Sequence, residues 1–494
     1  MSTQTTTRTD TGWGPLAVLM CGTFLVVLDF FIVNVALPSM QRELHASDSG
    51  LEWVVAGYGL TFSALLIAVT RLGDRIGRRR MFSAGVALFV AASAACGAAP
   101  SVELLVGARL VQGVAGAMVS PMVLALIGDV YAGPRLPRAI GIYSMVMGLA
   151  AATGQLIGGV LIHLDLAGSG WRAIFWVNVP IGLVTLVLAP RLLPDNRRSH
   201  TVGHAPGIDL VELALATTSL TALVLPLLEG RRLDWPLWTW LSLAGSVVAA
   251  VLTIARSRSL LRRGGRPLVE PAAFRSRTVV VAIASQGLLF VGMASYFVVL
   301  ALYLQNGRGL GPLASGAVFT LVAVPYIVGT SRQRTLAARL GRWTVPFGAG
   351  VFALGHVALL AAVLEEGVGG SLVDLMPGLA LAGFGMGIAL TGLIDAAMGG
   401  VEPAHAGTVS GVMSTAQQLG NALGVALVGM VFFGAVSGGY DHALTWSLVV
   451  LIGTTAGVAL LATLLHPHRP VVEEVALRPS RNPATPAQTA SEVS

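Results

Sequence analysis

Long apolar runs fill most of this chain, and their length limits the folds that it can adopt. Fourteen runs of about 20 residues stand between polar or turn-rich breaks. A helix of about 20 residues crosses the hydrocarbon core of a bilayer. The sequence therefore predicts an all-α integral membrane protein with fourteen transmembrane helices. The predicted spans are 15–38, 52–70, 81–99, 104–127, 138–162, 172–192, 208–229, 236–255, 278–304, 313–330, 343–363, 373–395, 407–434 and 443–465.

The composition agrees with this class and argues against others. Charged residues make up 11% of the 494 and apolar residues 54%, whereas a soluble protein carries about a quarter charged residues. Both cysteines, Cys21 and Cys96, lie inside apolar runs, so we expect no disulfide framework. The sequence contains no phosphate-binding loop, zinc-ligand spacing or convincing nucleophile motif. We therefore expect no enzyme activity, no metal, no cofactor and no ATP-driven pump.

Arginine placement sets the expected orientation. With the N-terminus inside, 25 of the 31 basic residues fall in cytoplasmic segments and 5 outside, and Arg109 lies within a span. Because basic residues concentrate on the cytoplasmic side, this bias predicts that both termini are cytoplasmic. It also explains the net charge of +7 without a nucleic-acid partner. All the basic residues are Arg, and Ala, Gly and Val are abundant, which is typical of a GC-rich bacterial genome.

A short repeat indicates two homologous halves. TRLGDRIGRRR follows the second predicted span and ARLGRW follows the tenth, on the same side of the membrane. Five regions follow from this division. They are a cytoplasmic tail at 1–14, a six-helix bundle at 15–192, two inserted helices with a linker at 193–277, a second six-helix bundle at 278–465 and a disordered tail at 466–494.

Asp29 lies near the middle of the first predicted span, inside LDFFIVNVALP. A charged group at that depth costs a few kcal/mol, so it must face the protein interior or a wet cavity. There it could load and unload a proton, or it could make a structural hydrogen bond to a neighbouring helix. Asn34 lies about 140° around the helix from Asp29, which favours a bond from Asn34 to another helix.

The fourth predicted span places Arg109, Gln112, Gly113 and Gly116 on one helical face, at i, i+3, i+4 and i+7. Small residues beside a buried Arg indicate a charge on a closely packed helix seam. The alternative is that the Arg109 side chain snorkels outward to the membrane surface.

The loop after the second span combines tight turns with dense charge. Gly77 permits a turn, and Asp74 can pair with a nearby Arg or cap a helix. A basic loop that only fixes topology would explain the arginines but not their G-D-R-x-G-R-R order. The residues that we single out there are Asp74, Arg75, Gly77, Arg78 and Arg79.

Two further spans carry faces of special composition. Ridges of small residues on the fifth span allow close helix approach, either as static packing or as a moving seam; they include Gly154, Gly158 and Gly159, with Gln155 beside them. A polar stripe on the thirteenth span should line a cavity or meet a partner helix. The candidate cavity-lining residues are Asn34, Gln112, Ser410, Ser414, Gln417 and Asn421.

These motifs together resemble the major facilitator superfamily, and within it the fourteen-helix drug:proton antiporters. LDFFIVNVALP resembles that group's helix-1 motif, GDRIGRRR the loop after helix 2, LVGARLVQGVAGA the Arg-containing helix-4 motif and GQLIGG the antiporter motif of helix 5. WRAIFWVNVPIGL, LYLQNGRGLGPLASG and SGVMSTAQQLGNALGVA are similar to stretches common in the group. The resemblance covers approximately residues 15–465.

Three positions depart from the family pattern. Thr70 stands where the loop motif usually opens with Gly, and Ser414 stands where Asn is common. Gln155 stands where the antiporter motif usually has Pro, which puts a kink of the fifth helix, and with it antiport, in question.

The resemblance implies two six-helix bundles plus two extra helices, with Asp29 and Arg109 in proton coupling and the loop from Asp74 to Arg79 in the conformational switch. It implies proton-coupled efflux of amphipathic small molecules by alternating access, from a bacterial cytoplasmic membrane. The expected partners are a small-molecule substrate, protons and the lipid bilayer, with a monomeric protein. Rival interpretations are uptake of a small nutrient and a membrane-embedded scaffold or enzyme.

Overall fold

The computed structural model describes residues 12–131, 135–194, 209–230, 233–265, 267, 276–399 and 406–465. Almost all of them are helical. The helices are α1 (Gly14–Leu44), α2 (Asp48–Ile76), α3 (Arg78–Gly97), α4 (Val102–Val130), α5 (Arg135–Leu164), α6 (Ala173–Trp176), α7 (Asn178–Leu192), α8 (Leu210–Glu229), α9 (Leu237–Arg262), α10 (Arg277–Leu302), α11 (Pro312–Leu340), α12 (Thr344–Glu366), α13 (Leu372–Gly399), α14 (Ala406–Ala435) and α15 (Tyr440–Ala462). The predicted tail at 466–494 and most of the tail at 1–14 lie outside the described residues.

Each predicted span overlaps a helix, with α6 and α7 together filling the sixth. In the described part of the chain, ten helical stretches are long and apolar enough to cross a membrane, or up to eleven if the bent α5 is one span. One of the ten, Pro312–Gly369, runs through both α11 and α12. The all-α membrane class is confirmed, whereas the number of crossings stays a prediction.

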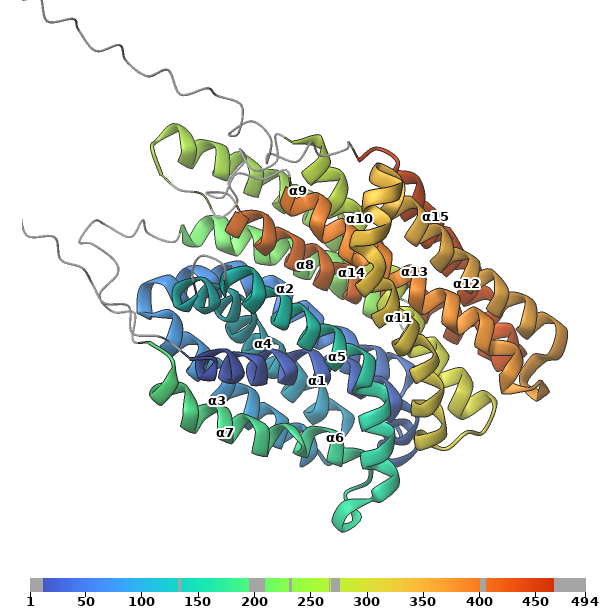
Figure 1. Ribbon diagram of the computed structural model, residues 1–494. Helices are drawn as coiled ribbons and strands as arrows, with labels where there is room; N and C mark the ends of the chain where they lie inside the picture. The colour runs from blue at the N-terminus through green and yellow to red at the C-terminus, as the bar shows by residue number, and fades with distance from the viewer. Residues whose placement is uncertain are drawn as a thin grey trace, which may run out of the picture.

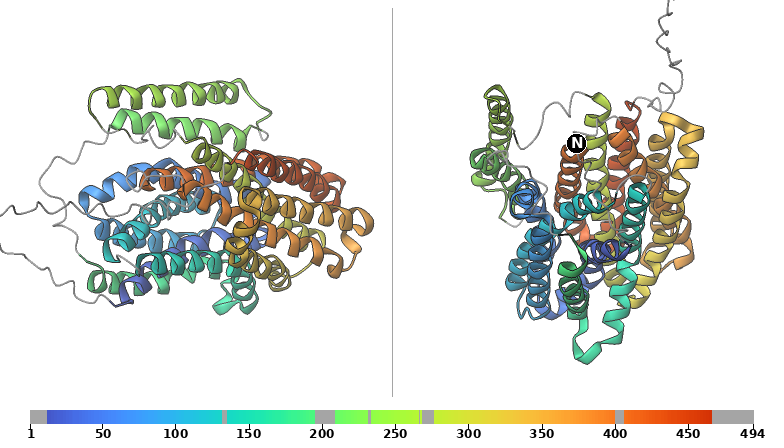
Figure 2. Two further views of the ribbon diagram at one scale, coloured as in Figure 1. Left: turned by 45° about the horizontal axis from the view of Figure 1, so that its top comes forward. Right: turned by 60° about the vertical axis from the view of Figure 1, so that its left-hand side comes forward.

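The helices form two groups that run side by side (Figures 1 and 2). In the first group α1 packs against α4, α5 and α7, and α3 packs against α4 and α7. In the second, α10 packs against α13, α14 and α15, and α12 packs against α13 and α15. The groups meet where α5 packs on α11, α2 on α14 and α1 on α10. A residue on α1, α2 or α5 can therefore contact both groups.

The helices α8 and α9 form a hairpin along one edge of the molecule (Figure 2). Only α8 packs closely on the body, against α2 and α14. The Trp53 indole N–H donates to Glu229 Oε1 at 2.5 Å, which ties α2 to the end of α8. At the other end of the hairpin, Arg256 Nη2 lies 2.7 Å from Asp209 Oδ2.

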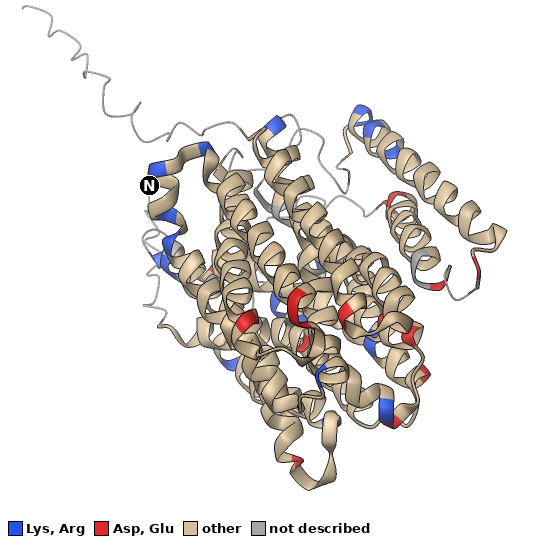
Figure 3. Cartoon of the chain, turned by 90° about the vertical axis from the view of Figure 1, so that its right-hand side faces the viewer, with Lys and Arg blue, Asp and Glu red and all other residues tan. Residues whose placement is uncertain are grey.

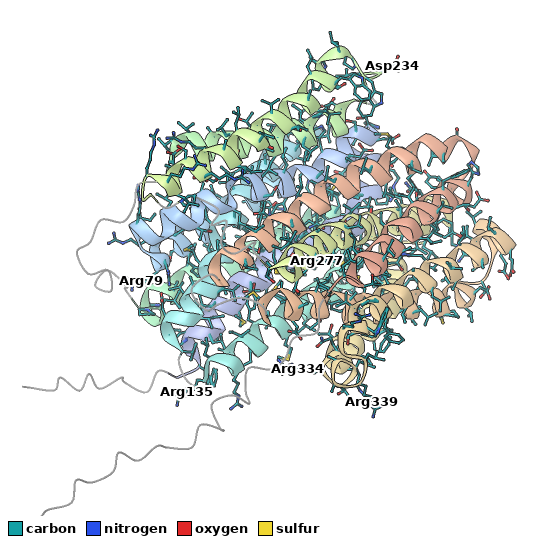
Figure 4. All side chains as sticks on the ribbon, turned by 90° about the horizontal axis from the view of Figure 1, so that it is seen from above. Arg79, Arg135, Asp234, Arg277, Arg334 and Arg339 are labelled. Atoms are coloured by element: carbon teal, nitrogen blue, oxygen red, sulfur yellow. The ribbon has the colours of Figure 1, made fainter. Side chains whose placement is uncertain are left out.

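Most helices carry no charged residue over most of their length (Figure 3). Arg79 and Arg135 lie at one end of the first helix group, and Asp234 lies in the turn between α8 and α9, at the tip of that hairpin (Figure 4). Gly77, between α2 and α3, has a φ of 103°, and Gly341, directly after α11, has a φ of 55°. A left-handed backbone favours glycine at both positions. In the R-L-G repeat Gly341 corresponds to Gly73, which lies inside α2, so the two copies end their helices at different positions.

Candidate functional site

The Asp29 carboxylate and the Arg109 guanidinium form a fully buried ion pair. Asp29 lies on α1 and Arg109 on α4, and both side chains are 0% exposed. Arg109 Nη1 donates to Asp29 Oδ2 at 2.5 Å. The alternative of an Arg109 side chain that snorkels to the membrane surface is therefore wrong, because its charge is neutralised inside the bundle.

Three neutral side chains surround the pair. Gln112 Nε2 and Asn178 Nδ2 each donate to Asp29 Oδ1 at 2.8 Å. The Ser93 hydroxyl oxygen accepts from Gln112 at 2.9 Å and from Asn178 at 3.3 Å. Because these residues come from α3, α4 and α7, the hydrogen-bond network around the α1 carboxylate joins four helices of the first group.

Arg109 has further contacts that do not depend on Asp29. Its Nε donates to the Val54 carbonyl at 2.9 Å, and its Nη1 to Gln112 Oε1 at 2.8 Å. The guanidinium carbon lies 4.6 Å from the centre of the Tyr58 ring, within cation–π range. Val54 and Tyr58 belong to α2, which packs on α14 of the second group. Arg109 therefore connects the Asp29 carboxylate to a helix at the boundary between the groups.

The glycines of α4 hold α2 close to this site. A Cβ on Gly113 would lie 2.3 Å from the Tyr58 carbonyl oxygen, and one on Gly116 would lie 2.5 Å from the Tyr58 hydroxyl. Any larger residue would push the two helices apart. The predicted face of the fourth span thus lies against α2, with Arg109 and Gln112 turned toward Asp29.

The residues of the loop after α2 connect helices of the first group. Arg78 Nη1 lies 2.8 Å from Asp129 Oδ1 at the end of α4, and Arg79 Nη1 donates to the Leu193 carbonyl at 3.1 Å, just after α7. The Gly77 N–H donates to the Gly73 carbonyl at 3.0 Å and ends α2. Arg75 is exposed, and the side chain of Asp74 lies outside the described residues.

The small residues of α5 face two helices. A Cβ on Gly154 would lie 3.0 Å from Phe31 Cβ, and one on Gly158 would lie 2.6 Å from Val35 Cγ1, so these two meet α1. A Cβ on Gly159 would lie 2.5 Å from the Pro312 carbonyl oxygen of α11. Gln155, between them, is 1% exposed. The ridges therefore form seams with both helix groups.

The remaining predicted residues are dispersed. Asn421 is buried and donates to Gln418 Oε1 at 2.8 Å within α14. Ser414 and Gln417 are half-buried, and the side chain of Ser410 lies outside the described residues. Asn34 is 2% exposed, but within the described part of the chain its amide oxygen accepts no hydrogen bond. The bond to a neighbouring helix that we expected is thus not found at that oxygen.

Three residues of the site were missed from the sequence. Ser93 and Asn178 complete the shell of Asp29, and Asp129 pairs with Arg78. Asn178 is the one polar residue in the apolar part of WRAIFWVNVPIGL, which was an available signal. Ser93 offered none, because a lone Ser in an Ala-rich span commonly bonds its own helix.

Comparison with known proteins places the chain in a family. A model described as Major Facilitator Superfamily matches residues 19–425. The probable actinorhodin transporter of Streptomyces coelicolor is 35% identical over 79% of this chain and 67% of its own length. The puromycin resistance protein of Streptomyces alboniger is 35% identical over 79% of this chain and 76% of its own.

Solved structures agree on the fold alone. A D-xylose-proton symporter superposes with a TM-score of 0.65 at 14% identity, covering 92% of this chain and 98% of that one. An autoinhibited peptide transporter of the POT family gives a TM-score of 0.64 at 16% identity over 95% and 99%. At such low identity the likeness concerns the arrangement of helices and not the substrate.

Proposed function

The chain belongs to the Major Facilitator Superfamily, and from that premise we propose that it exports amphipathic small molecules by exchange for protons. Membership makes it a multi-pass membrane transporter and not an enzyme. The names of its relatives, a transporter and a resistance protein, support export. The observation that carries the proton exchange is the buried Asp29–Arg109 pair.

Protonation of Asp29 would remove the negative charge that Arg109 neutralises. An uncompensated buried charge costs about 3–5 kcal/mol, so Arg109 would shift toward its other partners. Those partners are the Val54 carbonyl and the Gln112 amide oxygen. Because Val54 lies on α2, at the boundary between the helix groups, a proton on Asp29 would change the packing at that boundary. This is the link that alternating access requires.

The helix bundles and the loop after α2 each have a role in this proposal. The bundles at 15–192 and 278–465 would rock about the substrate, with the helices of 193–277 as an insert. The loop from Asp74 to Arg79 would act as the conformational switch, holding α3 against α4 through Arg78 and Asp129. Both termini would lie in the cytoplasm of a bacterial cell, in keeping with the arginine bias, and the protein would act as a monomer.

Asp29→Asn tests the proposal in proteoliposomes with an imposed pH gradient. Efflux driven by the gradient should be lost in Asp29→Asn and recovered in part by Asp29→Glu, which restores a carboxyl group. Asp234→Asn is the matched control, because Asp234 is exposed in the turn between α8 and α9. Thermal melting would show that each variant is folded. Unchanged pH-driven efflux in Asp29→Asn would refute the proton role, and inward flux with the gradient would favour nutrient uptake.

A further inference from the structure

Three buried side-chain amides lie where α1, α5, α11 and the end of α10 converge. Asn34, Gln155 and Gln305 are 2%, 1% and 4% exposed. Among the described residues, neither amide atom of Gln155 has a hydrogen-bond partner, and the amide oxygens of Asn34 and Gln305 have none. Exchanging the oxygen and nitrogen of Gln155 would not help, because both atoms lack a partner.

Backbone contacts bring these amides into one junction. Gln305 lies in η5 (Tyr303–Gly307), the π-helical turn that continues α10. Its Nε2 donates at 2.8 Å to the carbonyl of Val35, the residue after Asn34. On the α11 side, a Cβ on Gly316 would lie 2.7 Å from the Gln155 carbonyl oxygen. The junction therefore includes helices of both groups, and a ligand there would contact both.

Three phenyl rings pack together on the helices that carry or adjoin these amides. Phe31 on α1 and Phe297 on α10 have ring centres 5.4 Å apart, and Phe297 and Phe319 on α11 have centres 5.7 Å apart. Phe31 precedes Asn34 by one turn. The same helices therefore offer flat apolar faces beside neutral hydrogen-bonding groups.

The energetics of this arrangement favour a polar ligand without charge. Leaving a buried polar atom without a hydrogen bond costs stability, and the residues of this junction carry four such atoms. Amides both donate and accept hydrogen bonds, so carbonyl and hydroxyl groups complement them. The carboxylate of Asp29 is already paired with Arg109 and is not available to a cationic ligand.

We infer that this junction, formed by Asn34, Gln155, Gln305 and the three phenyl rings, is a substrate subsite for uncharged planar aromatic molecules that carry carbonyl or hydroxyl groups. The inference rests on the proposed function, because it assigns the substrate class of the same transport pathway. The amides bond the oxygen atoms of the ligand and the phenyl rings stack on its plane. The ligand gains access when the helix groups separate.

Equilibrium binding of two planar probes tests the inference. The full-length protein in lipid nanodiscs would be titrated with dihydroxyanthraquinone, which is neutral and oxygenated, and with ethidium, which is cationic. Gln155→Leu and Gln305→Leu should each weaken dihydroxyanthraquinone binding about fivefold to tenfold, the effect of one lost hydrogen bond. Ethidium binding should not respond.

Gln333→Leu is the matched control. Gln333 is also a buried amide on α11, 2% exposed, and its oxygen likewise has no partner in the described chain. It lies about 25 Å along the helix from Gly316. We expect this variant to bind both probes like the wild type. If a leucine variant does not fold, Gln155→Asn, which shortens the side chain but keeps the amide, takes its place with the same expectation.

Several outcomes would overturn the inference. They are unchanged dihydroxyanthraquinone binding in Gln155→Leu and Gln305→Leu, an equal loss in Gln333→Leu, or tighter binding of ethidium that responds to the same variants. A rise in thermal stability of Gln155→Leu without loss of binding would mean that the amides hold only internal water. Binding without pH-driven efflux in the wild type would refute the proposed function and leave the subsite intact.

Discussion

Replacing Asn178 by alanine tests the shell around Asp29, since it removes one donor and leaves the ion pair in place. Asn178 Nδ2 lies 2.8 Å from Asp29 Oδ1. A hydrogen bond to a charged group contributes about 1.5–3 kcal/mol, and 1.36 kcal/mol corresponds to about one pH unit. If Asp29 carries the proton, Asn178→Ala should move the pH dependence of proton release on substrate addition by about 1–2 units.

The direction of the shift follows from the state that Asn178 stabilises. Its amide donates to the ionised carboxylate, so removing the amide disfavours that form and the carboxyl keeps its proton to a higher pH. The profile should therefore move toward higher pH. The assay is proton release on substrate addition to the purified protein, measured over a range of pH. Thr185→Val is the control, because Thr185 is a buried residue of the same α7 whose hydroxyl donates to the Ile181 carbonyl at 2.8 Å and bonds the Cys21 thiol, and neither contact involves Asp29.

The result that would refute this reasoning is a profile within a few tenths of a pH unit of the wild type, in a variant with normal thermal stability. Asn178 would then be a structural residue, and the proton would bind elsewhere. A shift of the same size in Thr185→Val would attribute the effect to α7 packing and not to the hydrogen bond.

Three other perturbations follow from the helix contacts. Gly159→Val should destabilise the α5–α11 seam by about 1–3 kcal/mol, because even a Cβ would lie 2.5 Å from the Pro312 carbonyl oxygen; an unchanged melting temperature would contradict this contact. Arg78→Gln should lower the free energy of unfolding by less than about 1 kcal/mol, since the pair with Asp129 is partly exposed. The same variant should slow efflux markedly, and efflux at the wild-type rate would rule out a switch role for Arg78. Trp53→Phe should make the α8–α9 hairpin more sensitive to limited proteolysis, because it removes the donor to Glu229; equal digestion rates would show that the other α2–α8 contacts, among them the Thr217 hydroxyl donating to the Ala64 carbonyl at 3.2 Å, hold the hairpin without this bond.

The sequence predicted the helices, and it singled out Asp29 and Arg109 without predicting that they pair, for a physical reason. Apolar length alone determines which segments can cross a bilayer. Asp29 and Arg109 stood out because a charge in such a segment must be neutralised inside the protein. That the two charges neutralise each other was found only in the structure.

The neutral shell was harder to predict. Ser93 and Asn178 belong to this network because α3 and α7 pack near α1 in the folded bundle. The spacing of residues within one helix does not predict which other helices pack beside it. Asp129 sat at a helix end, where acidic residues are usually only solvated, so its pair with Arg78 had no signal in the sequence. The polar stripe of α14 shows the opposite case. Its spacing was clear in the sequence and predicted a cavity or a partner helix, but Asn421 donates to Gln418 within α14 itself.

The bend of α5 bears on the departure from the family pattern at Gln155. The helix α5 bends by 45° between Arg138–Ala151 and Thr153–Leu164, although position 155 is not proline. The Thr153 hydroxyl donates to the Leu149 carbonyl at 2.8 Å, a bond of the kind that bends helices. A proline at 155 would clash with the carbonyl of residue 151, which is where the bend already lies.

The bend and the amide of Gln155 can therefore be separated. Gln155→Pro should preserve the bend and remove the amide, so pH-driven efflux should persist while dihydroxyanthraquinone binding weakens about as much as in Gln155→Leu. Measuring both in one preparation distinguishes the two roles. Loss of efflux in Gln155→Pro together with normal efflux in Gln155→Leu would show that α5 does not tolerate the proline, and that the present bend differs from the one a proline imposes. Retained probe binding in Gln155→Pro would mean that the side-chain amide has no part in recognition.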